Sequence, residues 1–258
     1  MSKPTLVLLH GFLGSANDWS ALIGQLPNYN CIAFDLPGHG DAREQRLSRM
    51  ADFPCWLNQQ LQQRNISHYH LLGYSLGGRL ALQFAATQPA GLQSLLLENA
   101  HSGLSSLDER KTRARADARW ARRFYREPLT EVLADWYQQP VFADVSPAER
   151  AQLIAERSQN NAAQLAHMQC CCSLAKQADL YPWLKNTSLP VLYLCGKQDL
   201  KFQAIAVQLA THCSSVTQQI LAGGHNLHRA DPESMAAAIR QWLTNVYPNH
   251  LKLQVGGK

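Results

Sequence analysis

The stretch LLGYSLGGRLAL, residues 71–82, places a serine between two glycines where a short apolar run gives way to a helical pattern. Glycines at this spacing permit a cramped strand-to-helix turn that holds the hydroxyl of Ser75 at the edge of a sheet. A serine in such a turn becomes reactive when an imidazole takes its proton. The alternative is that Ser75 only caps an ordinary helix, but the strand before it and the helix after it favour the reactive turn.

The partners that a reactive serine needs are a carboxylate and an imidazole, in the chain order Ser, Asp, His. Asp199 closes the run VLYLCGKQD, and His225 closes the run ILAGGH, so both residues come where a strand is expected to end. The sequence therefore predicts a triad of Ser75, Asp199 and His225. Weaker candidates for the base are His39, His101 and His228.

The tripeptide HGF, residues 10–12, follows the first apolar run of the chain. In folds with a reactive serine of this kind, the loop after an early strand donates one backbone hydrogen bond to a developing oxyanion. We expect the N–H of Phe12 to be that donor and the N–H of Leu76, directly after the serine, to be the second.

Short runs rich in Leu, Val and Ile recur between longer helical stretches, which is typical of parallel strands buried on both faces. These runs are TLVLLH, CIAFDLPG, HYHLLGYS, LQSLLLENAH, VLYLCGKQD and VTQQILAGGH. The sequence predicts an α/β fold, with a mostly parallel central sheet flanked by helices. Strand signals lapse over 102–185, which predicts a helical cap inserted into a core of 1–101 and 186–258. No element is predicted for 250–258.

Basic residues concentrate between 110 and 126, which holds eight Lys or Arg and one acid, so the rest of the chain is slightly acidic despite the net charge of +5. On a helix of 100° per residue, Arg113 lies in a stripe with Asp117, Trp120 and Phe124. Arg113 is therefore expected to face the site, or alternatively to pair only with Asp117 at i+4. A solvated face is predicted for Arg115, Arg119, Arg122 and Arg126.

Two further arginines are expected to turn inward. Arg79 lies at i+4 from Ser75 and shares its helix face, and Arg157 falls on the apolar side of the stretch ERAQLIAERSQNN. Buried guanidinium groups need anions, and the planar fork of arginine binds carboxylates through two bonds. Converging arginines therefore favour a small-molecule substrate with several carboxylates and argue against a lipase.

Other classes of protein fit the sequence poorly. No nucleic-acid-binding motif accompanies the basic stretch, so no nucleic-acid partner is expected. The N-terminal apolar run is too short for a signal peptide and no segment approaches a membrane span, which predicts a cytoplasmic protein without stable membrane insertion. The seven cysteines include the run CCC without metal-binding spacing, so small buried thiols are expected rather than disulfides or a metal site. We expect a monomer.

Longer stretches resemble one family of α/β-hydrolases, the 2-succinyl-6-hydroxy-2,4-cyclohexadiene-1-carboxylate (SHCHC) synthases of menaquinone biosynthesis. The stretches are HGFLGSANDW, DLPGHG, GYSLGGR, RRFYREPLTEVLADWYQQPVF, ERSQNN, LCGKQDLKF and GGHNLHR. The run EPLTEVLADWYQQPVF is the most specific, because it falls in the inserted cap, where members of this fold differ most. The resemblance covers nearly the whole chain. It departs from the family pattern between Asp199 and His225, where this chain has four residues more than the family members.

The resemblance implies a lyase that removes pyruvate from 2-succinyl-5-enolpyruvyl-6-hydroxy-3-cyclohexene-1-carboxylate, without a metal or other cofactor. It implies catalytic roles for Ser75, Asp199 and His225. It implies substrate-binding roles for Tyr74, Arg79, Arg113, Trp136 and Arg157.

Two alternatives use the same fold. One is a serine carboxylesterase or C–C bond hydrolase acting on a small acidic substrate, and the other is a binding module without catalysis. The triad alone does not separate a lyase from a hydrolase, whereas the inward arginines and the cap sequence favour the lyase.

Overall fold

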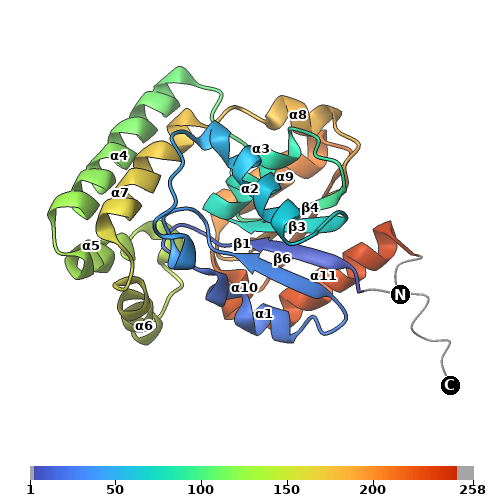
Figure 1. Cartoon of the computed structure of the whole chain (residues 1–258), viewed down its shortest axis with the longest axis horizontal. Helices are drawn as coiled ribbons and strands as arrows, with labels where there is room; N and C mark the ends of the chain where they lie inside the picture. The colour runs from blue at the N-terminus through green and yellow to red at the C-terminus, as the bar shows by residue number, and fades with distance from the viewer. Residues whose placement is uncertain (1–2, 249–258) are drawn as a thin grey trace.

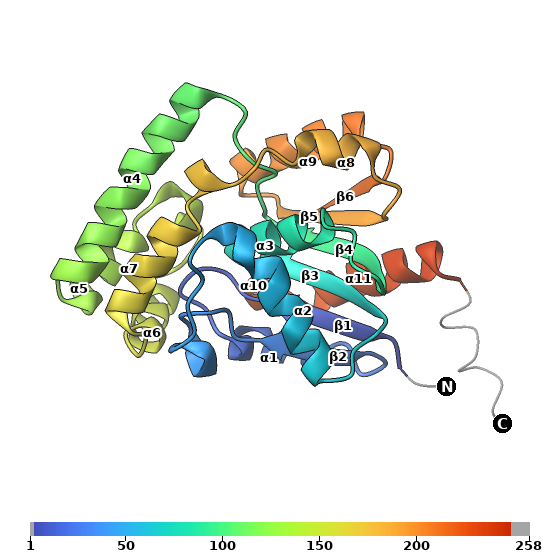
Figure 2. The ribbon, with the colours of Figure 1, turned by 45° about the horizontal axis from the view of Figure 1, so that its top comes forward.

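A single parallel sheet organises the molecule. The computed structural model describes residues 3–248, and its six strands follow the order β2-β1-β3-β4-β5-β6. The sheet is seen in Figure 1, and Figure 2 labels each strand. The strands are β1 (Thr5–Leu9), β2 (Asn30–Phe34), β3 (Tyr69–Tyr74), β4 (Leu92–Glu98), β5 (Val191–Gly196) and β6 (Val216–Leu221). All five neighbouring pairs are parallel, and every predicted strand is present. The prediction of an α/β fold with a parallel sheet is confirmed.

Helices cover both faces of this sheet (Figures 1 and 2). One face carries α2 (Phe53–Gln63), α3 (Leu76–Ala85) and α9 (Leu200–His212), and the other carries α1 (Ser20–Gly24), α10 (Leu227–Ala230) and α11 (Pro232–Val246). Short 3-10 turns join the elements at η1 (Ala16–Trp19), η2 (Gly40–Ala42) and η3 (Met50–Asp52).

Successive side chains of each strand alternate between the two helical layers, because the period of a strand is two residues. In β1, Val7 and Leu9 pack among the residues of α2, α3 and α9, whereas Leu6 and Leu8 pack with those of α1 and α11. All four are fully buried. Burial on both faces explains why the strands are continuous apolar runs in the sequence rather than alternating ones.

The segment between β4 and β5 is helical throughout. It contains α4 (Leu107–Arg126), α5 (Leu129–Trp136), η4 (Pro140–Phe142), α6 (Pro147–Arg157), α7 (Ala162–Cys171), η5 (Leu174–Lys176) and α8 (Tyr181–Asn186). Helices α4 to α7 gather at the end of the sheet that lies away from both termini (Figure 2). They share an apolar cluster of their own, with Phe124, Val132, Leu133 and Leu165 buried in it. We call α4 to α7 the cap; α8 packs against α9, and its Leu184 belongs to the sheet core.

Helix α4 illustrates how the sequence specifies these elements. The hydroxyl of Ser106 accepts a hydrogen bond from the N–H of Glu109, acids occupy the first turn, and Arg123 and Arg126 occupy the last. This charge order complements the helix dipole. The four arginines predicted to form a solvated face are exposed, as expected: Arg115, Arg119, Arg122 and Arg126.

The cysteine run only partly follows expectation. Cys171 and Cys172, at the end of α7, are buried, but Cys170 is exposed, and all seven cysteines are free thiols. Within the described part of the chain, no helix combines the length and apolarity needed to cross a membrane. The tail at 250–258, for which no element was predicted, lies outside the described residues.

One buried histidine makes stability depend on pH. His39 is fully buried, with Nε2 accepting from the N–H of Leu13 at 3.2 Å and Nδ1 lying 3.2 Å from the carbonyl of Pro37. Burial, and then the neighbouring His10, lower the pKa of His39 to about 3 from its usual 6.5. The folded state therefore holds His39 neutral, so its contribution is complete above pH 6.5 and is lost as the pH falls from 6.5 toward 3.

We expect the melting temperature to fall progressively below pH 6.5, and this fall to be shallower in His39→Gln, which does not titrate. The measurement is thermal unfolding from pH 8 to pH 4, with His68→Gln at an exposed histidine as the control. An unchanged slope in His39→Gln would show that the buried imidazole is not a source of the acid sensitivity.

Candidate functional site

The turn at Ser75 joins β3 to α3 in a conformation that non-glycine residues rarely adopt. Ser75 has φ 49° and ψ −108°. The turn is tight because α3 approaches the end of β1 closely: a β-carbon added at Gly77 would lie 2.2 Å from the carbonyl oxygen of Leu9. One added at Gly73 would lie 2.5 Å from the carbonyl oxygen of Gly77. The two glycines thus permit the strained turn, as the sequence pattern predicts.

Asp199 and His225 lie together at the ends of β5 and β6. Nδ1 of His225 is 2.6 Å from Oδ2 of Asp199, and both side chains are buried. The other carboxylate oxygen of Asp199 accepts the N–H of Phe202 and caps α9. A carboxylate placed in this way fixes the imidazole orientation and leaves Nε2 available as a base.

The serine and the imidazole come from neighbouring loops. The ring of Tyr74, next to Ser75 in the chain, is 5.3 Å from the ring of His225, and the hydroxyl of Tyr74 donates to Oδ1 of Asn226. Within the described residues, Ser75 Oγ forms no hydrogen bond, so the Ser75–His225 contact is not made in this conformation. Such bonds are often long without a ligand and tighten in the complex. The catalytic roles of the three residues stay predictions.

The expected oxyanion loop lies beside the serine. A β-carbon added at Gly11 would be 3.6 Å from the β-carbon of Ser75. Outside the regular elements of residues 3–248, neither Phe12 N–H nor Leu76 N–H donates a hydrogen bond, and Leu76 begins α3, where N–H groups have no partner within the helix. Both donors are therefore available near the hydroxyl, which is consistent with their predicted role.

The other histidines have structural partners. His228 is buried, and its Nδ1 lies 2.9 Å from both carboxylate oxygens of Glu98, also fully buried. His101 accepts the N–H of Gly103 through Nδ1, and burial is the main cause that lowers its pKa to about 4. Neither arrangement competes with His225 for Asp199.

Arg79 is a buried cation without a carboxylate partner in the described part of the chain. Its Nε donates to Oε1 of Gln177 and its Nη2 to the carbonyl of Cys172, both at 2.6 Å. Burial, followed by repulsion from Arg113, lowers the pKa of Arg79 to about 10. Neutral acceptors hold the guanidinium in place but do not neutralise it, so an incoming anion would relieve the electrostatic cost.

Arg113 does pair with Asp117, the alternative that the sequence left open, but this pair is not an isolated surface contact. Nε of Arg113 lies 2.8 Å and 2.9 Å from the two oxygens of Asp117. The buried carboxylate also accepts from Gln169 and Ser173. Among the described residues, all hydrogen bonds of Arg113 use Nε. Its terminal nitrogens therefore remain available for a ligand.

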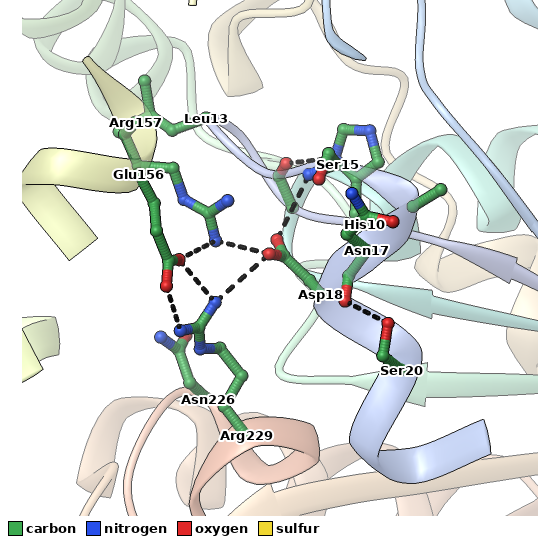
Figure 3. Close-up of polar contacts among 12 residues, drawn as sticks. His10, Leu13, Ser15, Asn17, Asp18, Ser20, Glu156, Arg157, Asn226 and Arg229 are labelled. Carbon is green, nitrogen blue, oxygen red and sulfur yellow. Dashed lines mark hydrogen bonds and ion pairs between the residues drawn. The ribbon is translucent and has the colours of Figure 1, made fainter. Parts of the chain in front are cut away.

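Arg157 already has an anion. Figure 3 shows its guanidinium, from α6 of the cap, directed at Asp18 of η1, with Nη2 2.6 Å from Oδ1. Burial opposes the charge of Arg157, but Asp18, and then Tyr137, raise its pKa. Arg229 of α10 reaches the same Asp18 oxygen at 3.2 Å and Glu156 at 3.0 Å. The sequence predicts that Arg157 meets an anion, and in this structure that anion belongs to the protein.

An aromatic group lies between the cap and the oxyanion loop. Trp136, at the end of α5, has its ring centre 5.2 Å from that of Phe12 and 4.9 Å from that of Trp120. A pocket of about 520 Å³ is lined in part by His225 and Asp199, and neither Trp136 nor Ser75 is among its lining residues. The η4 turn lines this pocket through Pro140 and Val141, and the residues that follow η4 line it through Ala143 and Asp144.

The sequence reasoning missed Asp18 and Gln177, which hold two of the candidate arginines. Asp18 meets Arg157 across 139 residues of chain, and Gln177 meets Arg79 across 98. No local pattern marks either residue, since each contact forms only when the cap folds onto the core. The sequence indicated only that each buried guanidinium needs a hydrogen-bonding or charged partner, and it did not indicate which residue that partner is.

Comparisons with known proteins agree with this geometry. The family model described as "alpha/beta hydrolase fold" matches residues 4–232. The chain belongs to the α/β hydrolase fold family. Esterase structures such as that from Thermogutta terrifontis, 21% identical with a TM-score of 0.78 over 95% of this chain and 91% of the other, share this fold.

Closer relatives narrow the family. The 2-succinyl-6-hydroxy-2,4-cyclohexadiene-1-carboxylate synthase of Citrobacter koseri is 44% identical over 93% of this chain and 94% of its own, and that of Klebsiella pneumoniae is 43% identical over 94% of each. The structure of MenH from S. aureus is 26% identical, with a TM-score of 0.88 over 95% of both chains. The chain is a member of the family of SHCHC synthases.

The buried pair of Asp18 and Arg157 provides a test of the contact between cap and core. Asp18→Ala leaves Arg157 buried without its anion, which typically costs about 3–5 kcal/mol. We expect a clear loss of melting temperature, and a smaller loss in the double variant with Arg157→Ala than the two single losses together. Thermal unfolding of the four proteins measures this coupling.

Asp135→Ala is the matched control, because its ion pair with Arg123 lies at the surface, where a pair contributes at most about 1 kcal/mol. Strictly additive losses for Asp18 and Arg157 would show that the two charges do not depend on each other.

Proposed function

We propose that this protein eliminates pyruvate from 2-succinyl-5-enolpyruvyl-6-hydroxy-3-cyclohexene-1-carboxylate to give 2-succinyl-6-hydroxy-2,4-cyclohexadiene-1-carboxylate, in menaquinone biosynthesis. The relatives named for this product match almost the full length of the chain. Those relatives are named as synthases of this product. The site described above contains groups suited to the elimination of pyruvate.

The chemistry begins with removal of a proton. His225, oriented by Asp199, takes the hydroxyl proton of Ser75, and the serine oxygen abstracts the ring proton next to the succinyl ketone. The N–H groups of Phe12 and Leu76 stabilise the negative charge that develops on the ketone oxygen. The electrons then return to form the C2=C3 double bond, the C3=C4 double bond shifts to C4=C5, and the bond from C5 to the enolpyruvyl oxygen breaks. The enolate of pyruvate that leaves takes up the proton held by His225 and becomes pyruvate, which restores Ser75 and His225 to their starting states. No water is consumed.

The observation that carries this proposal is the unneutralised charge of Arg79, buried four residues after Ser75. A neutral ester would leave that charge uncompensated, whereas a carboxylate of the substrate would pair with it. Arg113, held by Asp117 through one nitrogen, offers a second contact. Correct placement of a multiply charged substrate against the serine lowers the barrier by roughly several kcal/mol.

The remaining contacts are assigned in the same proposal. Trp136 and Tyr74 border the substrate ring, and Arg157 contributes to the positive field of the site through a guanidinium that Asp18 holds in place. The expected partner is this small polycarboxylate rather than a nucleic acid or a membrane, and the protein acts as a monomer in the cytoplasm. The free state of all seven cysteines supports a reducing compartment.

Purified protein should release pyruvate from the enolpyruvyl substrate, and Ser75→Ala and His225→Ala should each abolish most of this turnover. The reaction is followed by coupling pyruvate to its enzymatic reduction. A panel of activated esters assayed in parallel provides the comparison with a hydrolase. Ester cleavage that exceeds pyruvate release by orders of magnitude would favour the carboxylesterase alternative instead.

Arg79→Ala and Arg113→Ala should raise KM about 10-fold or more each, because hydrogen bonds to charged groups contribute about 1.5–3 kcal/mol. Arg157→Ala should also weaken substrate binding. Arg122→Ala, from the exposed face of the same α4 helix as Arg113, should change KM little. Equal losses for Arg122 and Arg113 would contradict the assignment of the two helix faces.

A further inference from the structure

Lys201 stands in a position that helix electrostatics disfavour. It is the second residue of α9, whose N-cap is Asp199. The N-terminus of a helix carries partial positive charge, so a cation there reduces helix stability. Residues that break such a rule are expected at functional sites, where another gain compensates for the loss.

The side chain faces the site rather than a protein partner. Lys201 lines the pocket of about 520 Å³ together with Asp199 and His225. Its neighbour Leu200 lines the same pocket and is 75% exposed, an unusual state for a large apolar side chain. A cation and an exposed apolar surface thus lie side by side, within one helical turn of the candidate catalytic acid.

The charged groups around Lys201 leave it without an ion pair. Asp199 attracts it, but that carboxylate is already bonded to His225 and to the N–H of Phe202. Asp144, on the cap side of the pocket, packs against Gly224 and forms no ion pair with Lys201. Within residues 3–248, no carboxylate oxygen lies within 4.0 Å of the Lys201 ammonium group. The ammonium group lies 5.6 Å from the centre of the Phe202 ring.

Nearby cations increase the need for an anion. The Lys201 side chain is exposed to solvent; partial desolvation of its ammonium group, and then Arg113, lower the pKa of Lys201, and Lys201 in turn helps to lower the pKa of His101. Arg113 and Arg157 have Asp117 and Asp18 as counterions, whereas Lys201 has none. A carboxylate bound at the pocket would supply the missing charge and raise the pKa of Lys201 again.

We propose that Lys201 and Leu200 form a substrate subsite, in which the ammonium group binds the terminal carboxylate of a flexible aliphatic arm and the leucine packs on its methylene groups. This inference rests on the proposed function and identifies the arm as the succinyl chain. A lysine suits this task because its point charge accepts a carboxylate from many directions. Lys201 thus positions the substrate, while the arginines near Ser75 hold the ring and the enolpyruvyl group.

Steady-state kinetics of pyruvate release test the subsite. Lys201→Gln should raise KM about 10-fold or more with kcat little changed, and Lys201→Arg should recover most of the loss. Lys197→Gln is the matched control, an exposed lysine four residues earlier that does not line the pocket, and its KM should stay within about two-fold of wild type.

A second substrate has the succinyl carboxylate converted to its methyl ester. It distinguishes loss of the contact between Lys201 and the carboxylate from a change that the substitution causes in the structure of the site. The ester should raise KM of the wild-type enzyme by a similar factor but leave KM of Lys201→Gln nearly unchanged, because the same contact is already lost. Wild-type and Lys201→Gln enzymes with equal KM for the free acid overturn the subsite. Absence of pyruvate release by the wild-type enzyme overturns the proposed function itself.

Discussion

The close approach of α3 to the end of β1 is the constraint on which the site depends. Only glycine at position 77 lets the helix lie against the carbonyl of Leu9, and this contact forces the positive φ of Ser75. The same approach brings Gly11, and with it the N–H of Phe12, next to the serine. The candidate nucleophile and the candidate oxyanion donors are therefore positioned by backbone packing, which is more rigid than an arrangement of side chains alone.

Positive charge is organised around this rigid centre in two ways. Arg113 and Arg157 are balanced by buried acids, which hold each guanidinium in place. Arg79 and Lys201 have no counterion among the described residues, so their charge is directed at whatever occupies the site. The cations with counterions are held in fixed positions, whereas the cations without counterions can attract an anionic ligand. A carboxylate would balance the second set, whereas a neutral ester would not.

The sequence predicted what depends on local pattern. Continuous apolar runs identified all six strands, and helical periodicity separated exposed Arg122 from partly exposed Arg113, which pairs with buried Asp117. Chain order, together with the expected strand ends, indicated Asp199 and His225, whose Oδ2 and Nδ1 atoms lie 2.6 Å apart in the structure. Contacts between cap and core escaped prediction. Asp18 lies far along the chain from its partner, and nothing in its neighbourhood in the sequence distinguishes it from a surface acid. Spatial partners of this kind are set by tertiary packing.

The hydrogen bonds of Arg79 limit how freely the cap of this protein could be replaced by the cap of another hydrolase. Its two acceptors, the carbonyl of Cys172 and the amide of Gln177, both come from the segment that returns from α7 toward the sheet. The floor of the site is thus completed by the inserted segment and not by the sheet domain alone. A chimera that joins the cap of another hydrolase to this core would keep the turn at Ser75. It would lose the two hydrogen-bond acceptors that hold Arg79 in place. In this protein the insertion and the candidate site therefore form one structural unit.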